Sequence, residues 1–302
     1  MMDGQPPSGE SRRSDPTFAV AFGGGGARGL AHIHVIEALD ELGIRPVAIA
    51  GSSIGAIMGA GMAAGMTGRD IHHYAHSILS RRGEVAARMW RARPGTFAEF
   101  IDGGLRVTQF NVERILGAFL PAQIPSSFDE LEIPLQVTAT DFFRHEQVVF
   151  EEGDLLSALA ASAAIPAVFR PVRRDGRILI DGGIYNPVPF DLIEGLADIT
   201  IGIDVVGVPT PHGKRTLNTL DLVFGSSQLM MQSIIALQLK TCRPSIFLRP
   251  PISRFRVLDF MKMEAVMAHT APIKDDLKRA LEAAVLEHEK LELARPSRQA
   301  KG

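Results

Sequence analysis

Residues 17–43 read TFAVAFGGGGARGLAHIHVIEALDELG, and this stretch decides the fold class of the chain. Thr17–Phe22 is a short apolar run with the composition of a buried strand, and residues 27–43 have the apolar spacing of a helix. Gly23–Gly26 join the two, and glycines at a helix N-terminus leave backbone N–H groups that can face an anion. A strand, a glycine turn and a helix in this order predict the first unit of an α/β sheet.

The alternation of apolar strands and helical patterns continues along the chain. Residues 48–50 and 178–180 are apolar at every position, as expected for strands that helices cover on both faces. This pattern predicts a mainly parallel α/β sheet in three layers. The predicted strands are Thr17–Phe22, Pro46–Ala50, Leu135–Asp141, Gln147–Phe150, Arg177–Ile180, Asp198–Val205 and Ser245–Leu248. The predicted helices cover 27–43, 54–65, 68–80, 110–119, 154–163, 217–240 and 274–293.

The composition is that of a folded globular protein, with 302 residues, 46% of them hydrophobic and 22% charged, and a net charge of −2. A near-neutral chain is not typical of nucleic-acid binding, and a single cysteine, Cys242, excludes an internal disulfide framework or a cysteine-rich metal site. The first residues show no apolar secretory signal, so we expect a cytoplasmic protein. Glutamines interrupt the apolar stretch Leu229–Leu239, which we interpret as a buried helix rather than a membrane span.

The chain is expected to hold one domain with two tails. Residues 1–16 are polar and predict a disordered N-terminal tail, and residues 294–302 predict a short basic tail. Residues 17–206 are expected to form the α/β core, and residues 207–293 a helical C-terminal extension packed on the same domain.

The glycine turn raises the hypothesis of a dinucleotide site, because Gly24, Gly26 and Gly29 fit the pattern G-x-G-x-x-G. Such a site needs an acidic residue at the end of the second strand to hold a ribose. Here that strand ends in Ala50-Gly51-Ser52-Ser53, without an acid. The missing acid disfavours a nucleotide, and the loop remains a turn suited to an anion.

A second motif, Gly51-Ser52-Ser53-Ile54-Gly55, follows a predicted strand and precedes a predicted helix. It has the pattern G-x-S-x-G in the strand–turn–helix context of a nucleophile elbow, where the glycines permit a sharp turn and the central serine projects from its apex. The alternative is a helix N-cap serine, which suits Ser52 better than Ser53. The motif therefore predicts Ser53 as a nucleophile.

A nucleophilic serine needs a base. No histidine that follows the acid candidates lies in a glycine-rich turn after a strand, where a Ser–acid–His triad would place it. Asp181 follows a strand and begins Asp181-Gly182-Gly183, at the sheet edge where α/β proteins bind ligands. The same tripeptide at Asp102 follows a helical segment, so we interpret Asp102 as a turn and Asp181 as the functional acid. The histidines interpreted as structural or surface residues are His32, His34, His212, His269 and His288.

The glycine loop, the serine elbow and the Asp-Gly-Gly turn, in this order and without a histidine base, resemble the patatin-like phospholipase family in its bacterial single-domain form. The resemblance covers about residues 17–206, with supporting blocks at Ala139-Thr140-Asp141, Ala161–Pro166 and Asp181–Pro189. It implies an α/β/α sandwich around a mainly parallel sheet. It also implies a serine hydrolase of fatty-acyl esters, acting on phospholipids or lysophospholipids without a metal or cofactor.

In a protein of this family Ser53 would be the nucleophile and Asp181 its base. A carboxylate is a weak base for a serine, so the reaction needs strong stabilisation of the developing oxyanion. The resemblance and the glycine loop together assign this role to backbone N–H groups of Gly24, Gly25, Gly26 and Ala27. Arg28 is expected to contact a substrate phosphate or to brace the loop. The remaining motif residues are Gly29, Gly51, Gly55, Gly182 and Gly183.

Residues 81–95 carry five arginines together with Met89 and the only tryptophan, Trp90. Such a segment suits peripheral contact with an anionic membrane surface, and the alternative is a solvated helix face, which charge runs usually form. The expected partners are therefore a lipid ester and at most a membrane surface, and the oligomeric state stays open. A catalytically idle lipid-binding or regulatory protein on the same scaffold is the alternative from a different functional class.

Overall fold

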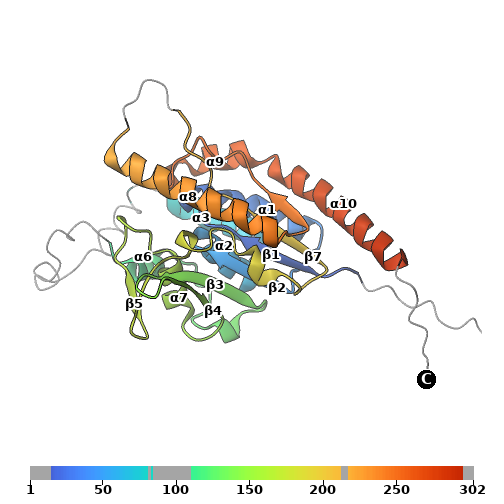
Figure 1. Cartoon of the computed structure of the whole chain (residues 1–302), viewed down its shortest axis with the longest axis horizontal. Helices are drawn as coiled ribbons and strands as arrows, with labels where there is room; N and C mark the ends of the chain where they lie inside the picture. The colour runs from blue at the N-terminus through green and yellow to red at the C-terminus, as the bar shows by residue number, and fades with distance from the viewer. Residues whose placement is uncertain (1–14, 81–82, 84–109, 212–216, 295–302) are drawn as a thin grey trace, which may run out of the picture.

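A computed structural model of the chain describes residues 15–80, 83, 110–211 and 217–294 (Figure 1). The strands are β1 (Phe18–Phe22), β2 (Ala48–Ser52), β3 (Leu135–Asp141), β4 (Glu146–Phe150), β5 (Val172–Arg174), β6 (Arg177–Asp181), β7 (Ile199–Ile203) and β8 (Ile246–Leu248). The α-helices are α1 (His32–Glu41), α2 (Ile54–Ala63), α3 (Gly68–Leu79), α6 (Val112–Phe119), α7 (Leu155–Ser162), α8 (Thr219–Thr241), α9 (Met263–Thr270) and α10 (Ile273–Ala294). Short 3₁₀ helices are η1 (Gly26–Ala31), η3 (Phe128–Glu130), η4 (Gly182–Ile184), η5 (Phe190–Ile193) and η6 (Phe260–Lys262).

The eight strands form one mixed sheet in the order β5-β6-β3-β2-β1-β7-β8, with β4 paired to β3 outside this path. The pairs from β3 through β2, β1 and β7 to β8 are parallel, so the predicted parallel sheet is confirmed for this centre. The pairs β3–β4, β3–β6 and β5–β6 are antiparallel. Only four residues join β3 to β4 and only two join β5 to β6, whereas a parallel crossover needs a dozen or more, so these two pairs have to be antiparallel.

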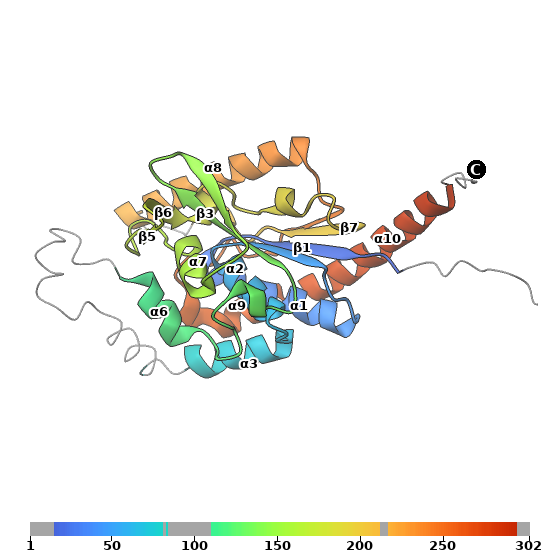
Figure 2. The ribbon, with the colours of Figure 1, turned by 90° about the horizontal axis from the view of Figure 1, so that it is seen from below.

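The two faces of the sheet are packed differently. Along β1 the large residues Phe18, Val20 and Phe22 enter one core, and the small residues Ala19 and Ala21 enter the other. Residues of α1, α2, α9 and α10 fill the large core, whereas η5 and α8 close the small one. Figure 2 shows the sheet between α8 on one side and α1, α3 and α10 on the other. The expected three layers are therefore present.

The structure corrects three local expectations. The predicted helix over 27–43 is divided into η1 and α1, and the predicted elements did not include β5 or α9. The region after residue 206 is more than a helical extension, because β8 pairs in parallel with β7 and completes the sheet. Asp102, His212 and all but one residue of the arginine-rich segment 81–95 lie outside the described residues.

Helix α8 is not the buried helix that the stretch Leu229–Leu239 predicted. Leu229, Met230 and Leu237 are 57–61% exposed, while Gln228 and Ile235 face the body of the protein. Within the described part of the chain, Asp221–Thr241 is the one helix long and apolar enough, by length and composition, to cross a membrane. The glutamines lie on the inner side together with Ile235, whereas Leu229, Met230 and Leu237 lie on the outer side.

Candidate active site

Ser53 occupies a strained turn between β2 and α2. Its backbone has φ 54° and ψ −125°, in the left-handed range that non-glycine residues seldom adopt. Gly55 permits this turn, because a Cβ atom at that position would lie 2.1 Å from the carbonyl oxygen of Phe22. The start of α2 thereby packs against the end of β1, and Ser53 stands at the carboxyl end of the parallel strands, where α/β sheets bind ligands.

Asp181 meets Ser53 directly, although 128 residues separate them in the sequence. The hydroxyl of Ser53 donates a hydrogen bond to Oδ2 of Asp181 at 2.6 Å, and each residue is 4% exposed. Asp181 is the last residue of β6, and η4 begins immediately after it. The structure thus brings together the two residues that the sequence singled out.

The surroundings of Asp181 favour its neutral form more than water does. Burial raises the pKa of the carboxyl group from its ordinary value of 3.8 to about 6, while hydrogen bonds from the Ser53 hydroxyl and the Gly183 N–H oppose that rise. Gly183 N–H donates to Oδ1 at 2.8 Å, and the Thr140 hydroxyl donates to the backbone carbonyl of Asp181 at 2.9 Å. A carboxylate with a pKa near 6 is a better proton acceptor than an ordinary one.

Ser162, the last residue of α7, is a positioning residue that the sequence analysis did not assign. Its hydroxyl accepts a hydrogen bond from the backbone N–H of Ser53 at 2.8 Å and so holds the elbow. The residue is fully buried. Ser162 lies in the block Ala161–Pro166, one of the stretches that resemble the family, but the block indicates no role for its serine.

The glycine loop offers fewer free N–H groups than expected. Gly24 N–H donates to the carbonyl of Pro187 at 2.9 Å, and Ala27 N–H donates to the carbonyl of Val257 at 2.7 Å. These two amides are engaged within the protein, which disfavours the expectation that they face an oxyanion. Among the described residues no acceptor contacts the N–H groups of Gly25 and Gly26.

Arg28 braces the loop. Its guanidinium donates to the carbonyls of Phe255 and Val206, both in segments that follow β7, and only 4% of the residue is exposed. Burial lowers its pKa to about 10, and the nearby Asp259 and Asp204 oppose that shift. Of the two roles expected for Arg28, bracing has contacts in the structure that account for it.

The other motif glycines are buried positions of close packing. A Cβ atom on Gly29 would lie 2.3 Å from Ile54 Cγ2, and one on Gly182 would lie 2.3 Å from the carbonyl oxygen of Thr138. On Gly51 it would lie 2.5 Å from the Cα of Ala56. A Cβ atom on Gly183 would have more room, because its nearest neighbour, Oδ1 of Asp181, would lie 3.0 Å away. These glycines let the elbow and the turn after β6 approach their neighbours.

Among the described residues, no histidine forms a hydrogen bond with Ser53 or Asp181. His32 is fully buried, its Nε2 is 2.8 Å from the carbonyl oxygen of Gly23, and burial lowers its pKa to about 4. His34 contacts the carbonyl of Met267, and the ring of His269 packs on Phe255. Their predicted structural role is confirmed. No group of three or more His, Cys, Asp or Glu residues in the described ranges is arranged to hold a metal ion.

A pocket of about 70 Å³ opens over Ser53 and Asp181. The glycine loop forms one wall, and α8 forms another through Val223, Phe224, Ser227, Gln228 and Met231. An adjoining hollow of about 290 Å³ shares Arg28, Phe224, Gln228 and Val257 with the pocket. The described residues that line the pocket include no histidine.

Comparison with known proteins matches this chain to one family. The profile of the family described as Patatin-like phospholipase matches residues 20–193, a range that holds the glycine loop, Ser53 and Asp181. An uncharacterised NTE family protein of Mycobacterium tuberculosis is 39% identical over 196 residues, which cover 64% of this chain and 50% of that protein. Human patatin-like phospholipase domain-containing protein 6 is 28% identical over 280 residues, 83% of this chain and 19% of that protein. The chain therefore spans about half the length of the first relatives it matches.

Two solved structures are similar in fold at low sequence identity. Human GIVD cytosolic phospholipase A2 superposes with a TM-score of 0.43 at 12% identity, over 91% of this chain and 61% of that one. VipD from Legionella pneumophila superposes with a TM-score of 0.40 at 15% identity, over 85% of this chain and 67% of that one.

Proposed function

The chain belongs to the patatin-like phospholipase family, and from this premise we propose that it hydrolyses fatty-acyl esters of phospholipids or lysophospholipids through Ser53 and Asp181. The family implies lipid acyl hydrolase activity in general. The observation that carries the finer proposal is the 2.6 Å hydrogen bond from the Ser53 hydroxyl to a buried carboxyl group of raised pKa. A serine and a base within hydrogen-bond reach are the minimal machinery of nucleophilic acyl transfer.

The proposed reaction has two steps. Ser53 Oγ attacks the ester carbonyl carbon while Asp181 Oδ2 takes the hydroxyl proton, and the tetrahedral intermediate expels the alcohol, which leaves with that proton. Water then attacks the acyl-serine ester and gives a proton to Asp181, and the fatty acid departs as Ser53 recovers its proton. Each step returns Asp181 to the state in which it began, so no cofactor is consumed.

The negative charge on the carbonyl oxygen needs a partner during both steps. Gly25 and Gly26 line the pocket beside Ser53, and their N–H groups are the proposed donors. Removing one such donor typically costs a hydrolase about 3 kcal/mol of transition-state stabilisation. The N-terminus of α2 at Ile54 adds a favourable field at the same place.

The adjoining hollow supports a long acyl substrate. The pocket of about 70 Å³ holds little more than the reacting ester, and the neighbouring 290 Å³ shares its walls at Phe224, Gln228 and Val257. We place the chain of the fatty acid there.

The proposed compartment is the cytoplasm, because the only cysteine of the sequence, Cys242, is a free thiol.

A catalytically idle lipid-binding protein is the alternative from a different class. It would bind lipid at the same pocket without cleaving it. The contacts of Ser53 favour the hydrolase, because a strained serine held at 2.6 Å from a buried carboxyl group has a chemical use and no packing use.

Labelling with a fluorophosphonate, read by intact mass, tests the nucleophile. The wild-type protein is expected to gain one adduct, and Ser53→Ala is expected to gain none, because only a serine with a base is nucleophilic enough to react. Ser52→Ala is the matched control: its hydroxyl is equally buried and has no hydrogen-bond partner among the described residues, so its loss should leave labelling intact. An unlabelled wild type would favour the idle scaffold, and labelling of Ser53→Ala would assign the nucleophile to another residue.

The pH dependence of hydrolysis tests the base. Asp181 accepts the proton only when ionised, and its pKa is about 6, so kcat/KM toward an uncharged ester should rise roughly tenfold per pH unit below pH 6 and level off above it. The measurement is kcat/KM between pH 4.5 and pH 8. A rate that is constant across this range, or that falls through pH 6 as the pH rises, contradicts the assignment of Asp181 as the base.

A further inference from the structure

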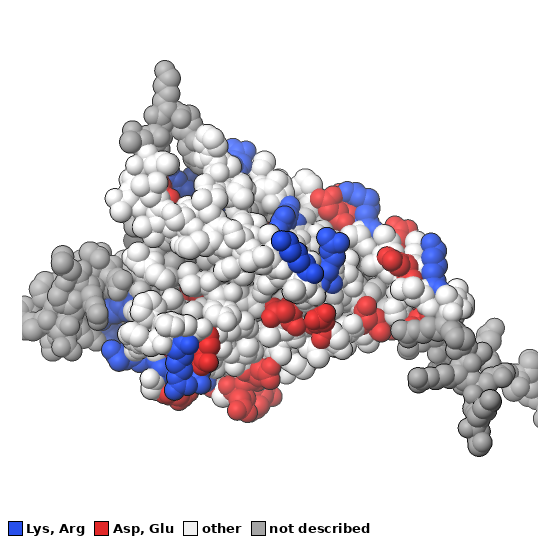
Figure 3. Space-filling model, viewed as in Figure 1, with Lys and Arg blue, Asp and Glu red and all other residues white. Residues whose placement is uncertain are grey.

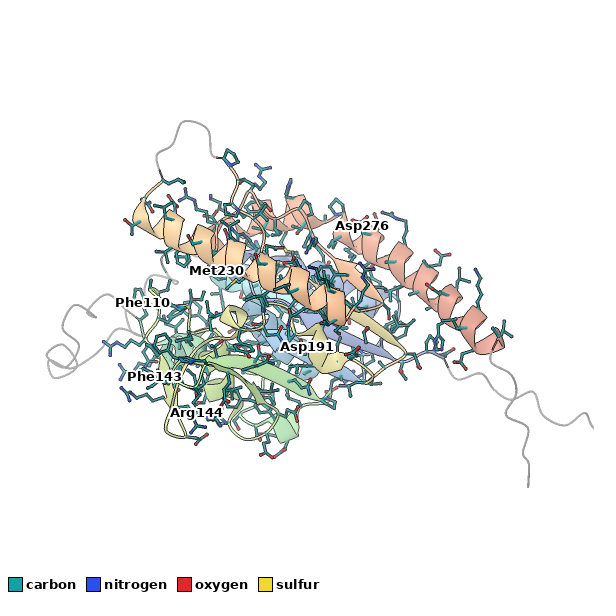
Figure 4. The ribbon with its side chains drawn as sticks, in the orientation of Figure 1. Phe110, Phe143, Arg144, Asp191, Met230 and Asp276 are labelled. Atoms are coloured by element: carbon teal, nitrogen blue, oxygen red, sulfur yellow. The ribbon has the colours of Figure 1, made fainter. Side chains whose placement is uncertain are left out.

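The outer face of α8 carries large exposed apolar side chains along most of its length, with the exposed Ser226 and Ser233 between them. Leu222, Val223, Leu229, Met230 and Leu237 are between 44% and 61% exposed, and their spacing places them on one side of the helix. No charged residue occurs from Leu222 to Leu239. Figure 3 shows a broad surface without Lys, Arg, Asp or Glu in the region where Figure 1 places α8, and Figure 4 shows Met230 near the middle of that helix.

The inner face of the same helix carries its polar anchors. Gln228 Nε2 donates to the carbonyl of Val206 at 3.3 Å, Gln232 Nε2 to Oδ2 of Asp204 at 3.1 Å, and Gln238 Nε2 to Oδ1 of Asn186 at 3.1 Å. A surface helix in water has its apolar side toward the core and its polar side outward. In α8 the inner face holds Met231, Ile235 and Leu239 beside the glutamines, but large apolar residues are exposed on the outer face as well. The outer face is therefore suited to an apolar environment.

We propose that α8 lies on a lipid surface through this outer face and holds the mouth of the pocket against that surface. The proposal rests on the proposed function for its choice of a lipid rather than a protein partner, because the substrate of such a hydrolase is part of a lipid surface. The helix lies on the surface and does not cross it, since three glutamines hold its other face to the body of the protein.

Continuity with the pocket argues for a lipid surface. Val223 belongs both to the exposed face and to the pocket lining, and Phe224, Ser227 and Met231 on the same helix line the pocket. An ester that leaves a lipid layer beside α8 therefore reaches Ser53 without crossing open water. Tyr185, which follows η4, is also exposed, and tyrosine is enriched where proteins meet the membrane interface.

The charge at the end of α8 agrees with an anionic surface. Lys240 in the last turn and Arg243 just beyond the helix are both exposed. Basic residues beside an apolar face add attraction to anionic headgroups. The described surface thus combines an apolar stripe with basic residues at one end of it, which is the pattern of an interfacial helix.

Vesicle flotation of the full chain tests the proposal. Vesicles contain phosphatidylcholine with a minority of phosphatidylglycerol, and every protein carries Ser53→Ala so that no lipid is cleaved. The triple variant Leu229→Gln/Met230→Gln/Leu237→Gln should bind at least about tenfold more weakly, because it removes apolar side chains that the lipid would bury. The matched control is Leu286→Gln/Leu291→Gln/Leu293→Gln on α10, which changes side chains of similar exposure and should bind as strongly as the parent.

A second readout separates this proposal from the proposed function. With Ser53 restored, the α8 variant should hydrolyse a water-soluble short-chain ester at the parent rate, because none of its three changed residues lines the pocket, and should lose activity toward vesicles. Equal vesicle binding by the α8 variant and its parent overturns the docking proposal, and so does a change from dimer to monomer in light scattering with vesicle binding unchanged. Binding that depends on α8 in a protein that cleaves no ester would uphold the docking and overturn the hydrolase.

Discussion

Ser53→Ala and Asp181→Asn are each expected to lower kcat/KM for phospholipid hydrolysis by at least about 10⁴-fold at pH 7.5. Alanine removes the oxygen that forms the acyl-enzyme, and asparagine keeps the shape of the base but cannot accept the proton through Oδ2. The two residues act as one unit, so the double variant should be no worse than either single variant. Fatty-acid release from a defined phospholipid measures the effect.

The control for these variants is a substitution at Ser162, which contacts the backbone of Ser53 and not its hydroxyl. Ser162→Ala removes only the hydroxyl that accepts the Ser53 N–H, so its activity should lie between the parent and the dyad variants. If Asp181→Asn keeps most of the activity, another group is the base. If the double variant is much worse than either single variant, the two residues contribute independently and the dyad mechanism is wrong.

Asp181→Asn is expected to stabilise the fold at neutral pH while it inactivates the protein. Folding raises the pKa of Asp181 from 3.8 to about 6, so the folded state binds this proton more tightly than the unfolded state. The resulting contribution to stability is fully present below pH 3.8 and is lost as the pH rises through 6, a loss of about 3 kcal/mol. Asparagine does not titrate, so the free energy of unfolding of the variant relative to the parent should rise by about this amount between pH 4 and pH 7.

Urea unfolding at several pH values measures this difference, and the titrations common to both proteins cancel. Asp70→Asn is a control of opposite sign, because hydrogen bonds from the side chain and backbone of Thr67 lower the pKa of Asp70. That variant should lose stability relative to the parent above pH 3.8. A difference between Asp181→Asn and the parent that stays constant with pH would show that burial does not raise the pKa of Asp181.

The sequence predicted the elbow at Ser53, the place of Asp181 at a strand end and the central parallel sheet, because these features depend on local sequence patterns. A glycine at position 55 and a serine at position 53, between an apolar strand and a helix, permit few structures other than the elbow that is observed. Asp181 was identified by its place at the end of a strand, and its contact with Ser53 follows from strand order. The central parallel sheet followed from strands that are apolar on both faces.

The features that depend on contacts between residues far apart in the sequence were not predicted. Whether the N–H groups of Gly24 and Ala27 were free depended on Pro187 and Val257, which lie far along the chain. The prediction that α8 is buried was wrong for a related reason. In the sequence the glutamines only interrupt an apolar stretch. Their hydrogen bonds to Val206, Asp204 and Asn186 show that they face inward. Ser162 had no signal of its own, because a buried serine at a helix end has no chemical pattern in sequence.

Strand β3 carries no side chain of the dyad, yet it sets the distance between its two members. It pairs with β2 through Leu135–Thr138 and with β6 through Ala139–Asp141, and Ser53 follows β2 while Asp181 ends β6. A slip of one residue between β3 and β6 would displace Asp181 by about 3.4 Å along the strand, more than the hydrogen bond tolerates. In the proposed mechanism, Ser53 is therefore synthesised 128 residues before Asp181 and meets its base only when β6 pairs with β3. Under the proposed function, reactivity toward lipid esters depends on the pairing of β3 with β6.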